Sequence, residues 1–394
     1  MNSNKRQTLF FSLDQIIDSG LVFIFIAIGG NLLDKSDMAN VVLFQSVALV
    51  SVLFCSCFTT QYLLLRYKKQ SSLFWLKLFL FFCIITMLIV SLWFQSAEIL
   101  FLFFVGISSE YIKRYCFYIN NSCLSFFSTI ITAFIFFVFI LMCWLNFMRI
   151  NSTIYIYIYS GAKLIPLTII CCFLFIKTKF NSDGEYEMPS LWYAITDSLR
   201  FGGVFSVITI IYWITNQGFF IFFHDRMPAA ELVEIRVTQN VFGVVTMLIA
   251  LYDSMFLKKN IENKNKIFDW RSYFKFLVIS IVLITFNFIL LYILSITIYK
   301  HLDVFKYSIC LALAQFFYLS ARMPVLILKL RYSLSIILWL YVCSLFLSSC
   351  YLFLKHNDYD FQYIVQSITL SNLFIFLFSL LIVFYKERIY GKNY

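Results

Sequence analysis

Hydrophobic residues are grouped along this chain into runs long enough to cross a membrane. A helix needs about 20 mostly apolar residues to span a bilayer, and twelve runs meet that length, with short polar segments between them. The runs are residues 9–31, 39–65, 73–94, 97–118, 123–146, 153–176, 200–223, 230–257, 272–298, 303–321, 334–354 and 362–385. Charged residues interrupt the fourth and the tenth. Twelve spans place both termini on one side of the membrane.

A polar segment near the middle divides the predicted spans into two sets of six. This segment, KTKFNSDGEYEMPS at 177–190, includes Gly184 and Pro189, which are typical of a loop. The sequence therefore predicts an all-α polytopic membrane protein made of two six-helix bundles. We place the N-terminal bundle at 1–176, a cytoplasmic linker at 177–192 and the C-terminal bundle at 193–394.

Basic residues are distributed unequally between the two sides of the membrane that these spans define. Nineteen lie in the set of ends and loops that includes both termini, and five lie in the opposite set. Cytoplasmic loops of membrane proteins carry an excess of Lys and Arg. We therefore expect both termini in the cytoplasm.

Composition supports the membrane interpretation independently of the spans. The 394 residues are 62% hydrophobic and 13% charged, and the mean hydropathy is +0.86. Soluble domains are about 45–50% apolar and about 25% charged. The net charge of +11 would suggest nucleic acid in a soluble protein. Here the basic residues fall between apolar runs, so we expect membrane lipids as partners and no nucleic acid.

Signals for enzymatic chemistry or metal binding are weak in this sequence. The eleven cysteines form no CxxC pair, the three histidines lie far apart, and no GxxxxGK[ST] motif occurs. The best acidic candidate on an external loop is HNDYDF at 356–361, which we interpret as a solvated loop. We predict no catalytic residue, cofactor or metal site.

Two aspartates interrupt the first apolar run. Asp14 and Asp18 are four residues apart, which places both carboxylates on one face of a helix. They argue against a cleaved signal peptide, and we interpret the run as an uncleaved span. A carboxylate near the bilayer centre costs about 2.5–3.5 kcal/mol on insertion scales. We interpret the pair as an ion-coupling site that binds H⁺ or Na⁺ in a water-filled cavity and faces polar groups from the other half. Alternatively, interfacial water reaches Asp14.

Further polar residues lie inside predicted spans of both halves. They are Gln45, Lys163, Asn216, Gln217, Arg236 and Asn240. Intramembrane ionisable residues usually face a functional interior, so we select these as candidates for a substrate cavity. The two basic residues can instead snorkel or pair with a neighbouring acid, and the amides can instead hold helices together.

Several segments, taken in order, resemble one family of transporters. LDQIIDSGLVFIF resembles the first span of bacterial polysaccharide exporters, and SEYIKRYCFYIN at 109–120 resembles the segment that follows their fourth span. LRFGGVFSVITIIYWITNQGFF and AAELVEIRVTQNVFGVVTMLIALYDSMFLKK are similar to their seventh and eighth helices. These segments cover about a third of the chain. The family is the multidrug/oligosaccharidyl-lipid/polysaccharide (MOP) exporter superfamily, and its O-antigen (Wzx-type) flippases are the nearest match. DKSDMAN replaces the common Gly-Pro loop after the first span.

The resemblance implies a fold and a function. It implies two six-helix bundles around a central cavity and a substrate of undecaprenyl-diphosphate-linked oligosaccharide, moved from the cytoplasmic to the periplasmic leaflet. A cationic cavity suits a diphosphate, which favours Arg236 and Lys163, with Arg200 and Arg114 near the cytoplasmic entrance. Other polysaccharide-assembly membrane proteins are candidate partners. Two alternatives are an O-antigen polymerase, which is an enzyme, and a drug/cation antiporter of the same fold.

Overall fold

The structure is a computed structural model, and it describes most of the chain. The described residues are 3–60, 62, 72–119, 121–145, 150–180, 190–224, 226–243, 270–355 and 361–390. Three of the predicted features therefore fall wholly or partly outside them. These are most of the linker, the second half of the eighth span, and the acidic loop at 356–360.

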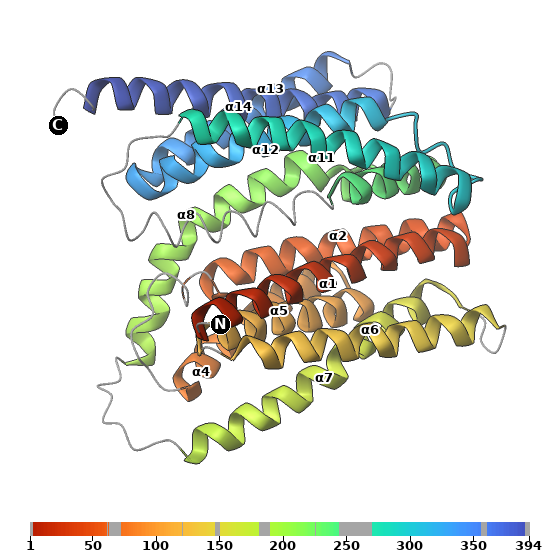
Figure 1. The fold of residues 1–394 in the computed structure, drawn as a ribbon, viewed down its shortest axis with the longest axis vertical. Helices are drawn as coiled ribbons and strands as arrows, with labels where there is room; N and C mark the ends of the chain where they lie inside the picture. Colours follow the sequence, from red (N-terminus) through yellow and green to blue (C-terminus); the bar gives the residue numbers. More distant parts are fainter. Residues whose placement is uncertain are drawn as a thin grey trace. The chain divides into compact units, whose positions relative to one another are not determined.

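Every regular element in the described part of the chain is a helix (Figure 1). The first half contains α1 (Ser3–Leu32), α2 (Lys35–Phe58), α4 (Ser72–Trp93), α5 (Ala97–Tyr118), α6 (Ser122–Trp144) and α7 (Ser152–Phe180). The second half contains α8 (Leu191–Gln217), α9 (Phe219–Phe222), a helix over residues 229–243, α11 (Trp270–Thr297), α12 (Ser308–Arg331), α13 (Leu334–Leu354) and α14 (Phe361–Tyr390). Each predicted span overlaps one of these helices, so the all-α prediction is confirmed.

Nine helices in the described residues are long and apolar enough to cross a membrane, or ten if the bent α8 is one span. Helix α5, the fourth predicted span, is not among the nine. It carries charged side chains at Glu98, Glu110, Lys113 and Arg114, which lower its hydropathy. The tenth prediction, 303–321, begins too early, because α12 starts at Ser308 and continues to Arg331. The protein is a multi-pass membrane protein.

Several helices begin at a polar residue that caps them. The Ser96 hydroxyl accepts from Ile99 N at the start of α5, and the Asn151 side chain accepts from Ile154 N at the start of α7. The Gln7 side chain of α1 accepts from Ser122 N at the start of α6. The first amides of a helix have no partner within the helix, so these side chains fix where the helices begin.

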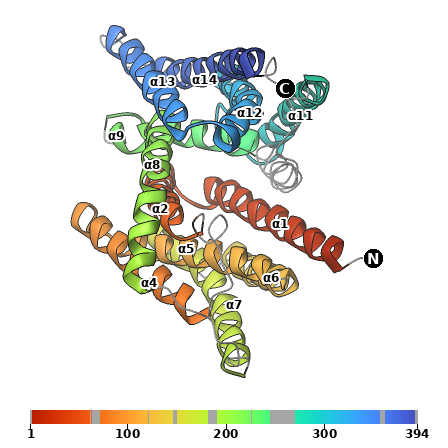
Figure 2. The ribbon, with the colours of Figure 1, turned by 90° about the vertical axis from the view of Figure 1, so that its left-hand side faces the viewer.

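The chain separates into two compact units, and each is built around its own helix contacts. Unit 1 comprises residues 1–21 and 32–210, and unit 2 comprises residues 22–31 and 211–394. In unit 1, α2 and α7 pack against α5, and α7 also packs against α6. In unit 2, α14 packs along α12 and α13 (Figure 2). The predicted domain boundaries stay a prediction.

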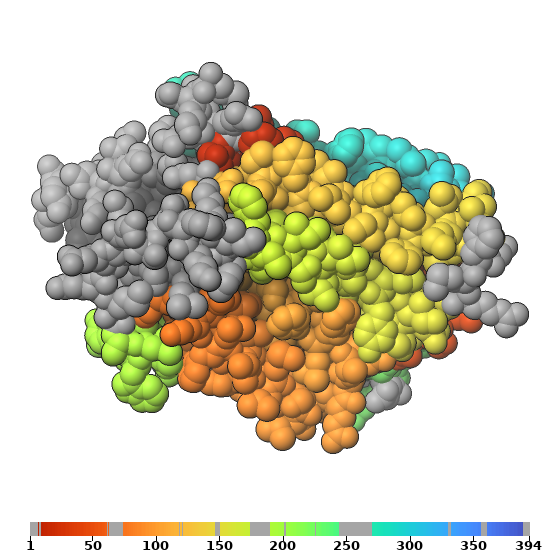
Figure 3. Space-filling model, turned by 90° about the horizontal axis from the view of Figure 1, so that it is seen from below, coloured from red at the N-terminus to blue at the C-terminus, as the bar shows by residue number. Residues whose placement is uncertain are grey.

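Large apolar side chains cover much of the surface. Leu92 and Trp93 of α4 are 81% and 80% exposed, and Phe134 of α6 and Ile169 of α7 are also exposed. Figure 3 shows one face on which the side chains of α4, α6 and α7 lie at the surface. Water would oppose so much exposed apolar area, whereas lipid accepts it. These faces therefore contact the acyl chains.

Candidate functional site: a buried cluster of acidic and basic side chains

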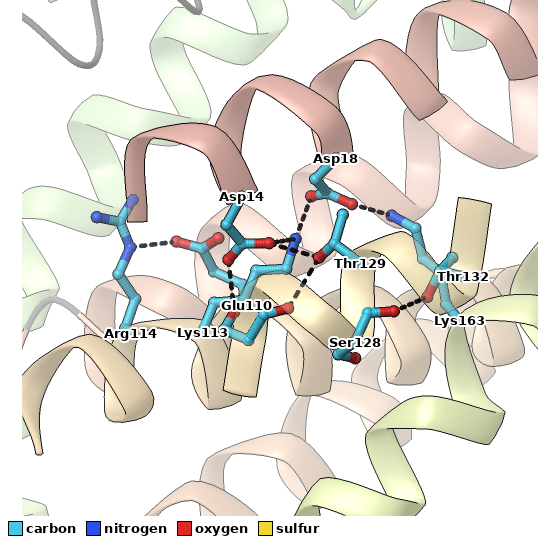
Figure 4. Close-up of polar contacts among 10 residues, drawn as sticks. Asp14, Asp18, Glu110, Lys113, Arg114, Ser128, Thr129, Thr132 and Lys163 are labelled. Atoms are coloured by element: carbon cyan, nitrogen blue, oxygen red, sulfur yellow. Dashed lines mark hydrogen bonds and ion pairs between the residues drawn. The ribbon is translucent and has the colours of Figure 1, made fainter. Parts of the chain in front are cut away.

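As predicted, α1 carries two carboxylates on one side of the helix. This side of α1 lies against charged residues of other helices. Asp14 and Asp18 project from α1 toward Lys113 of α5 and Lys163 of α7 (Figure 4). We call these four residues the acid–base cluster. All four belong to unit 1. We expected the aspartates to face polar groups of the other half, and the structure instead gives them partners within their own unit.

Asp14 is the innermost member of the cluster. Its carboxylate has no exposed surface. The hydroxyl groups of Ser125 and Thr129, both on α6, donate one short hydrogen bond to each of its oxygens. The ammonium of Lys113 lies 3.7 Å from one of those oxygens. Two hydroxyl donors and a nearby cation satisfy a carboxylate that water does not reach.

Asp18 lies one turn further along α1, and two lysines hold it. The Lys113 ammonium is 2.8 Å from one oxygen and the Lys163 ammonium is 3.0 Å from the other. Lys163 also lies over the ring of Tyr159, 4.9 Å from its centroid. The Asp18 side chain remains 27% exposed, whereas Lys113 and Lys163 are 6% and 11% exposed. Asp18 is therefore the most accessible member of the cluster.

The acid–base cluster is balanced in charge. Two carboxylates face two ammonium groups, so the group carries no formal net charge when all four are ionised. Removing one partner of a buried ion pair costs about 3–5 kcal/mol because the other charge is left buried. The balance explains how four ionisable residues remain inside one bundle of apolar helices.

A second polar cluster lies in unit 2, where three of the predicted residues meet. Arg236, on the helix at 229–243, donates to the side-chain oxygen of Gln217 at 3.2 Å, and its guanidinium lies 5.4 Å from the centre of the Phe220 ring. Asn216 receives hydrogen bonds from Asn372 of α14 and from Gln239. Arg236 is buried. This arrangement joins α8, the helix at 229–243 and α14.

The other predicted residues lie outside these two clusters. Asn240 donates to the backbone oxygen of Phe23, also within unit 2. Arg114 pairs with Glu110 at 2.9 Å and lies over the Phe11 ring. Gln45 of α2 is half-buried, and Arg200 of α8 is exposed.

The sequence reasoning missed several residues that hold these clusters together. Lys113 was counted among the basic residues at the cytoplasmic end of the fourth predicted span, but it is buried inside α5. Arg322 was counted with the cytoplasmic residues that follow the tenth predicted span, but it lies inside α12 and donates to the Tyr318 hydroxyl at 2.6 Å, outside both clusters. The excess of basic residues on the predicted cytoplasmic side survives the loss of both. Asn372 was not selected, although it is an amide inside an apolar helix, which is the signal that selected Asn216.

A smaller polar group lies at the ends of the helices of unit 2, outside the spans. Lys306 pairs with Glu231 at 3.1 Å, and the Tyr307 hydroxyl donates to the same carboxylate. Hydrogen bonds with Tyr307 and Glu231 raise the pKa of Lys306, and burial raises the pKa of Tyr307 to about 12. Lys306 therefore stays charged and Tyr307 neutral at physiological pH, which keeps the connection before α12 in place.

The cysteines and the other metal-ligating residues form no site within the described ranges. All eleven cysteines are free, and five of them are buried. No group of three or more His, Cys, Asp or Glu side chains that could hold a metal ion occurs there.

Comparison with known proteins identifies the fold. No protein-family model matches the sequence, and no curated protein matches it. Among solved structures, a variant of the Vibrio cholerae MATE transporter VcmN has a TM-score of 0.55 and 11% identity, with 98% of each chain covered. The eukaryotic MATE transporter AtDTX14 has a TM-score of 0.54 and 13% identity, with 97% of this chain and 95% of that chain covered.

A third similar structure carries the superfamily name. It is an outward-facing multidrug resistance MATE family transporter of the MOP superfamily, with a TM-score of 0.51, 11% identity, and 99% of this chain and 97% of that chain covered. The chain thus has the two-part helical fold of MATE transporters of the MOP superfamily. That is the superfamily which the sequence motifs resemble.

Proposed function

We propose that this protein is a transporter that moves a lipid-linked saccharide, carried on undecaprenyl diphosphate, from the cytoplasmic to the periplasmic leaflet of a bacterial inner membrane. The resemblance of the motifs and the MATE-like fold support transport without a covalent step. Transport proceeds by alternating access, in which the substrate favours one of two facing states. Both termini lie in the cytoplasm, as the distribution of basic residues predicts.

The observation that carries the proposal is the way lysines neutralise the buried aspartates. Asp14 and Asp18 already face two ammonium groups at 2.8–3.7 Å. A cationic drug would therefore find no net negative charge in the acid–base cluster. An anionic diphosphate can instead form charge-assisted hydrogen bonds with a lysine of the cluster once that lysine exchanges its carboxylate partner for the ligand. Lys163 of unit 1 and Arg236 of unit 2 are separate candidates for contact with the diphosphate.

The amides of unit 2 are the residues that we assign to the saccharide. Asn216, Gln217 and Asn240 present both donors and acceptors, which sugar hydroxyl groups require. Gln45 is a further candidate of the same chemistry, and Arg200 and Arg114 are candidates for the cytoplasmic entrance.

An ion gradient provides the energy in this proposal. One charge that crosses a potential of 100 mV gains about 2.3 kcal/mol. A proton or a sodium ion would act at Asp14 and Asp18, where it must compete with the lysines for the carboxylates. Coupling therefore requires that the ion pairs of the cluster break during the transport cycle.

Mass spectrometry of lipid-linked saccharides in a deletion strain tests the function. We expect single repeat units on undecaprenyl diphosphate to accumulate in the cytoplasmic leaflet and to disappear when the wild-type gene is restored. Single units transferred to the outer surface in the deletion strain would instead indicate the alternative of a polymerase.

A drug/cation antiporter is the second candidate function, because the similar structures include a multidrug resistance transporter. The same deletion strain distinguishes it. An antiporter predicts increased sensitivity to cationic drugs with an unchanged pool of lipid-linked saccharides. Normal drug sensitivity together with stranded repeat units would exclude it.

A further inference from the structure

We propose that Lys113 and Lys163 form a binding site for a phosphate or diphosphate group, and that the Asp18 carboxylate occupies this site until such a ligand displaces it. The proposal rests on the proposed function only for the source of the ligand, the diphosphate of a lipid-linked saccharide. The geometry of the acid–base cluster carries the rest.

The first step is the way the two lysines hold Asp18. Each ammonium contacts a different oxygen of the same carboxylate, at 2.8 and 3.0 Å. Two cations from two helices, α5 and α7, thus face one anion between them (Figure 4). The oxygens of a phosphate group accept the same charge-assisted hydrogen bonds. The Asp18 carboxylate therefore occupies a position that also suits the phosphate group of a bound ligand.

The second step is the contrast between the two aspartates. Asp14 is fully buried, and hydroxyl groups of Ser125 and Thr129 hold both of its oxygens. Asp18 is 27% exposed, and its described contacts are with the lysines alone. Asp14 therefore remains in place as a permanent counter-ion, while Asp18 can leave without breaking any other described bond.

The third step concerns the contacts that the two lysines keep when the Asp18 carboxylate is displaced. Lys113 keeps Asp14 at 3.7 Å, and Lys163 keeps the face of the Tyr159 ring. A cation over an aromatic ring retains part of its stabilisation. The incoming anion restores the remaining charge balance. The exchange thus leaves neither buried lysine without a partner, and the carboxylate that loses its partners is the most exposed member of the cluster.

Displacement has a consequence for affinity. An attached carboxylate competes with a free ligand at a high effective concentration, so the wild-type site binds anions weakly and releases them readily. Removal of the Asp18 charge should therefore tighten anion binding. A purely structural ion pair predicts the opposite, because loss of one partner would only disorder the site.

The test measures anion binding to the purified full-length protein in lipid nanodiscs. The probes are inorganic pyrophosphate and farnesyl diphosphate, which separate a free phosphate from a lipid headgroup of the same chemistry. We expect Asp18→Asn to bind farnesyl diphosphate about tenfold more tightly than wild type, the effect of ~1.4 kcal/mol of lost internal competition. If Asp18→Asn bound only pyrophosphate more tightly, the ligand of this site would be a free phosphate and not a lipid headgroup.

A matched control and two lysine variants complete the test. Glu98→Gln removes the charge of an α5 carboxylate that accepts hydrogen bonds from Ser96 and Thr153, outside the cluster, and should leave binding unchanged. Lys163→Gln should abolish the gain in the Asp18→Asn background, while Lys163→Arg should keep it. If Asp18→Asn does not fold, the two lysine variants are measured in the wild-type background. There, Lys163→Gln should lose anion binding and Lys163→Arg should retain it. Unchanged or weaker binding by a folded Asp18→Asn variant overturns the proposal.

The result is separable from the test of function. If the deletion strain accumulates lipid-linked units but Asp18→Asn binds no more tightly than wild type, the exchange fails and the transport function stands. If Asp18→Asn binds diphosphates more tightly but the deletion leaves saccharides unchanged, the anion site stands and its ligand is not a lipid-linked saccharide.

Discussion

At the scale of single residues, Asp14 depends on hydroxyl groups as much as on charge. Thr129→Val keeps the volume of the side chain but removes one of the two hydroxyl donors to this buried carboxylate. A buried acceptor that loses its donor costs about 1–3 kcal/mol. We expect a lower midpoint of thermal unfolding for the purified protein in detergent.

Thr132→Val is the matched control for this prediction. Thr132 lies on the same helix and is equally buried, but its hydroxyl donates only to the backbone oxygen of Ser128. Removal of the Thr132 hydroxyl takes no hydrogen-bond donor away from a charged group, so the midpoint of thermal unfolding should change little. Equal shifts for the two variants would show that Asp14 does not depend on Thr129.

The sequence could predict some members of the candidate site but not their pairing. The spacing of Asp14 and Asp18 placed them on one face of a helix, and Lys163 stood out as a lone cation in an apolar run. Lys113 did not stand out, because charged neighbours in SSEYIKRY indicated the polar end of a span. Which acid meets which base depends on how α1, α5 and α7 pack, and a single sequence does not encode that in any local pattern.

At the scale of helices, the contact between α2 and α8 depends on the absence of a side chain. A Cβ at Gly202 would lie 2.6 Å from Phe58 Cδ1 and 2.9 Å from the backbone oxygen of Cys57. The backbone oxygen has little freedom to move. We expect Gly202→Ala to lower the thermal midpoint, at a cost of about 1–3 kcal/mol for overpacking.

The neighbouring glycine provides the comparison. A Cβ at Gly203 would meet nothing within 4 Å, and alanine favours a helix over glycine by about 1 kcal/mol. Gly203→Ala should therefore leave the midpoint unchanged or raise it. A midpoint for Gly202→Ala at or above that of wild type would show that α8 moves away from α2 without loss.

The helices themselves were more predictable than their ends. Long apolar runs are a direct physical requirement of the bilayer, and each run corresponds to a helix. The ends depend on capping residues such as Ser96 and Asn151, and on charged turns that continue a helix beyond its apolar part. This is why the tenth span, predicted at 303–321, is instead α12 at Ser308–Arg331.

At the scale of the whole molecule, the orientation in the membrane can be tested directly. The predicted cytoplasmic side keeps most of its basic residues after Lys113 and Arg322 are reassigned to helices. A green fluorescent protein fused to the C-terminus should therefore fluoresce, and alkaline phosphatase fused there should be inactive. Phosphatase inserted between α1 and α2, at Asp34, should be active. Active phosphatase at the C-terminus would reverse the assignment.

The last prediction connects the acid–base cluster to transport. Asp18→Asn removes the anion that competes for the two lysines, so a bound diphosphate should leave more slowly. Alternating access requires both binding and release, and an interaction that is too strong in one state traps the transporter there.

We therefore expect Asp18→Asn to insert normally into the membrane while cells carrying it accumulate lipid-linked repeat units in the cytoplasmic leaflet. Glu98→Gln, which removes the charge of an α5 carboxylate outside the cluster, should behave like wild type. Mass spectrometry of the two strains measures the difference, with membrane content of each variant determined in parallel. Full transport by a normally inserted Asp18→Asn protein would show that neither ion coupling nor anion exchange depends on this carboxylate.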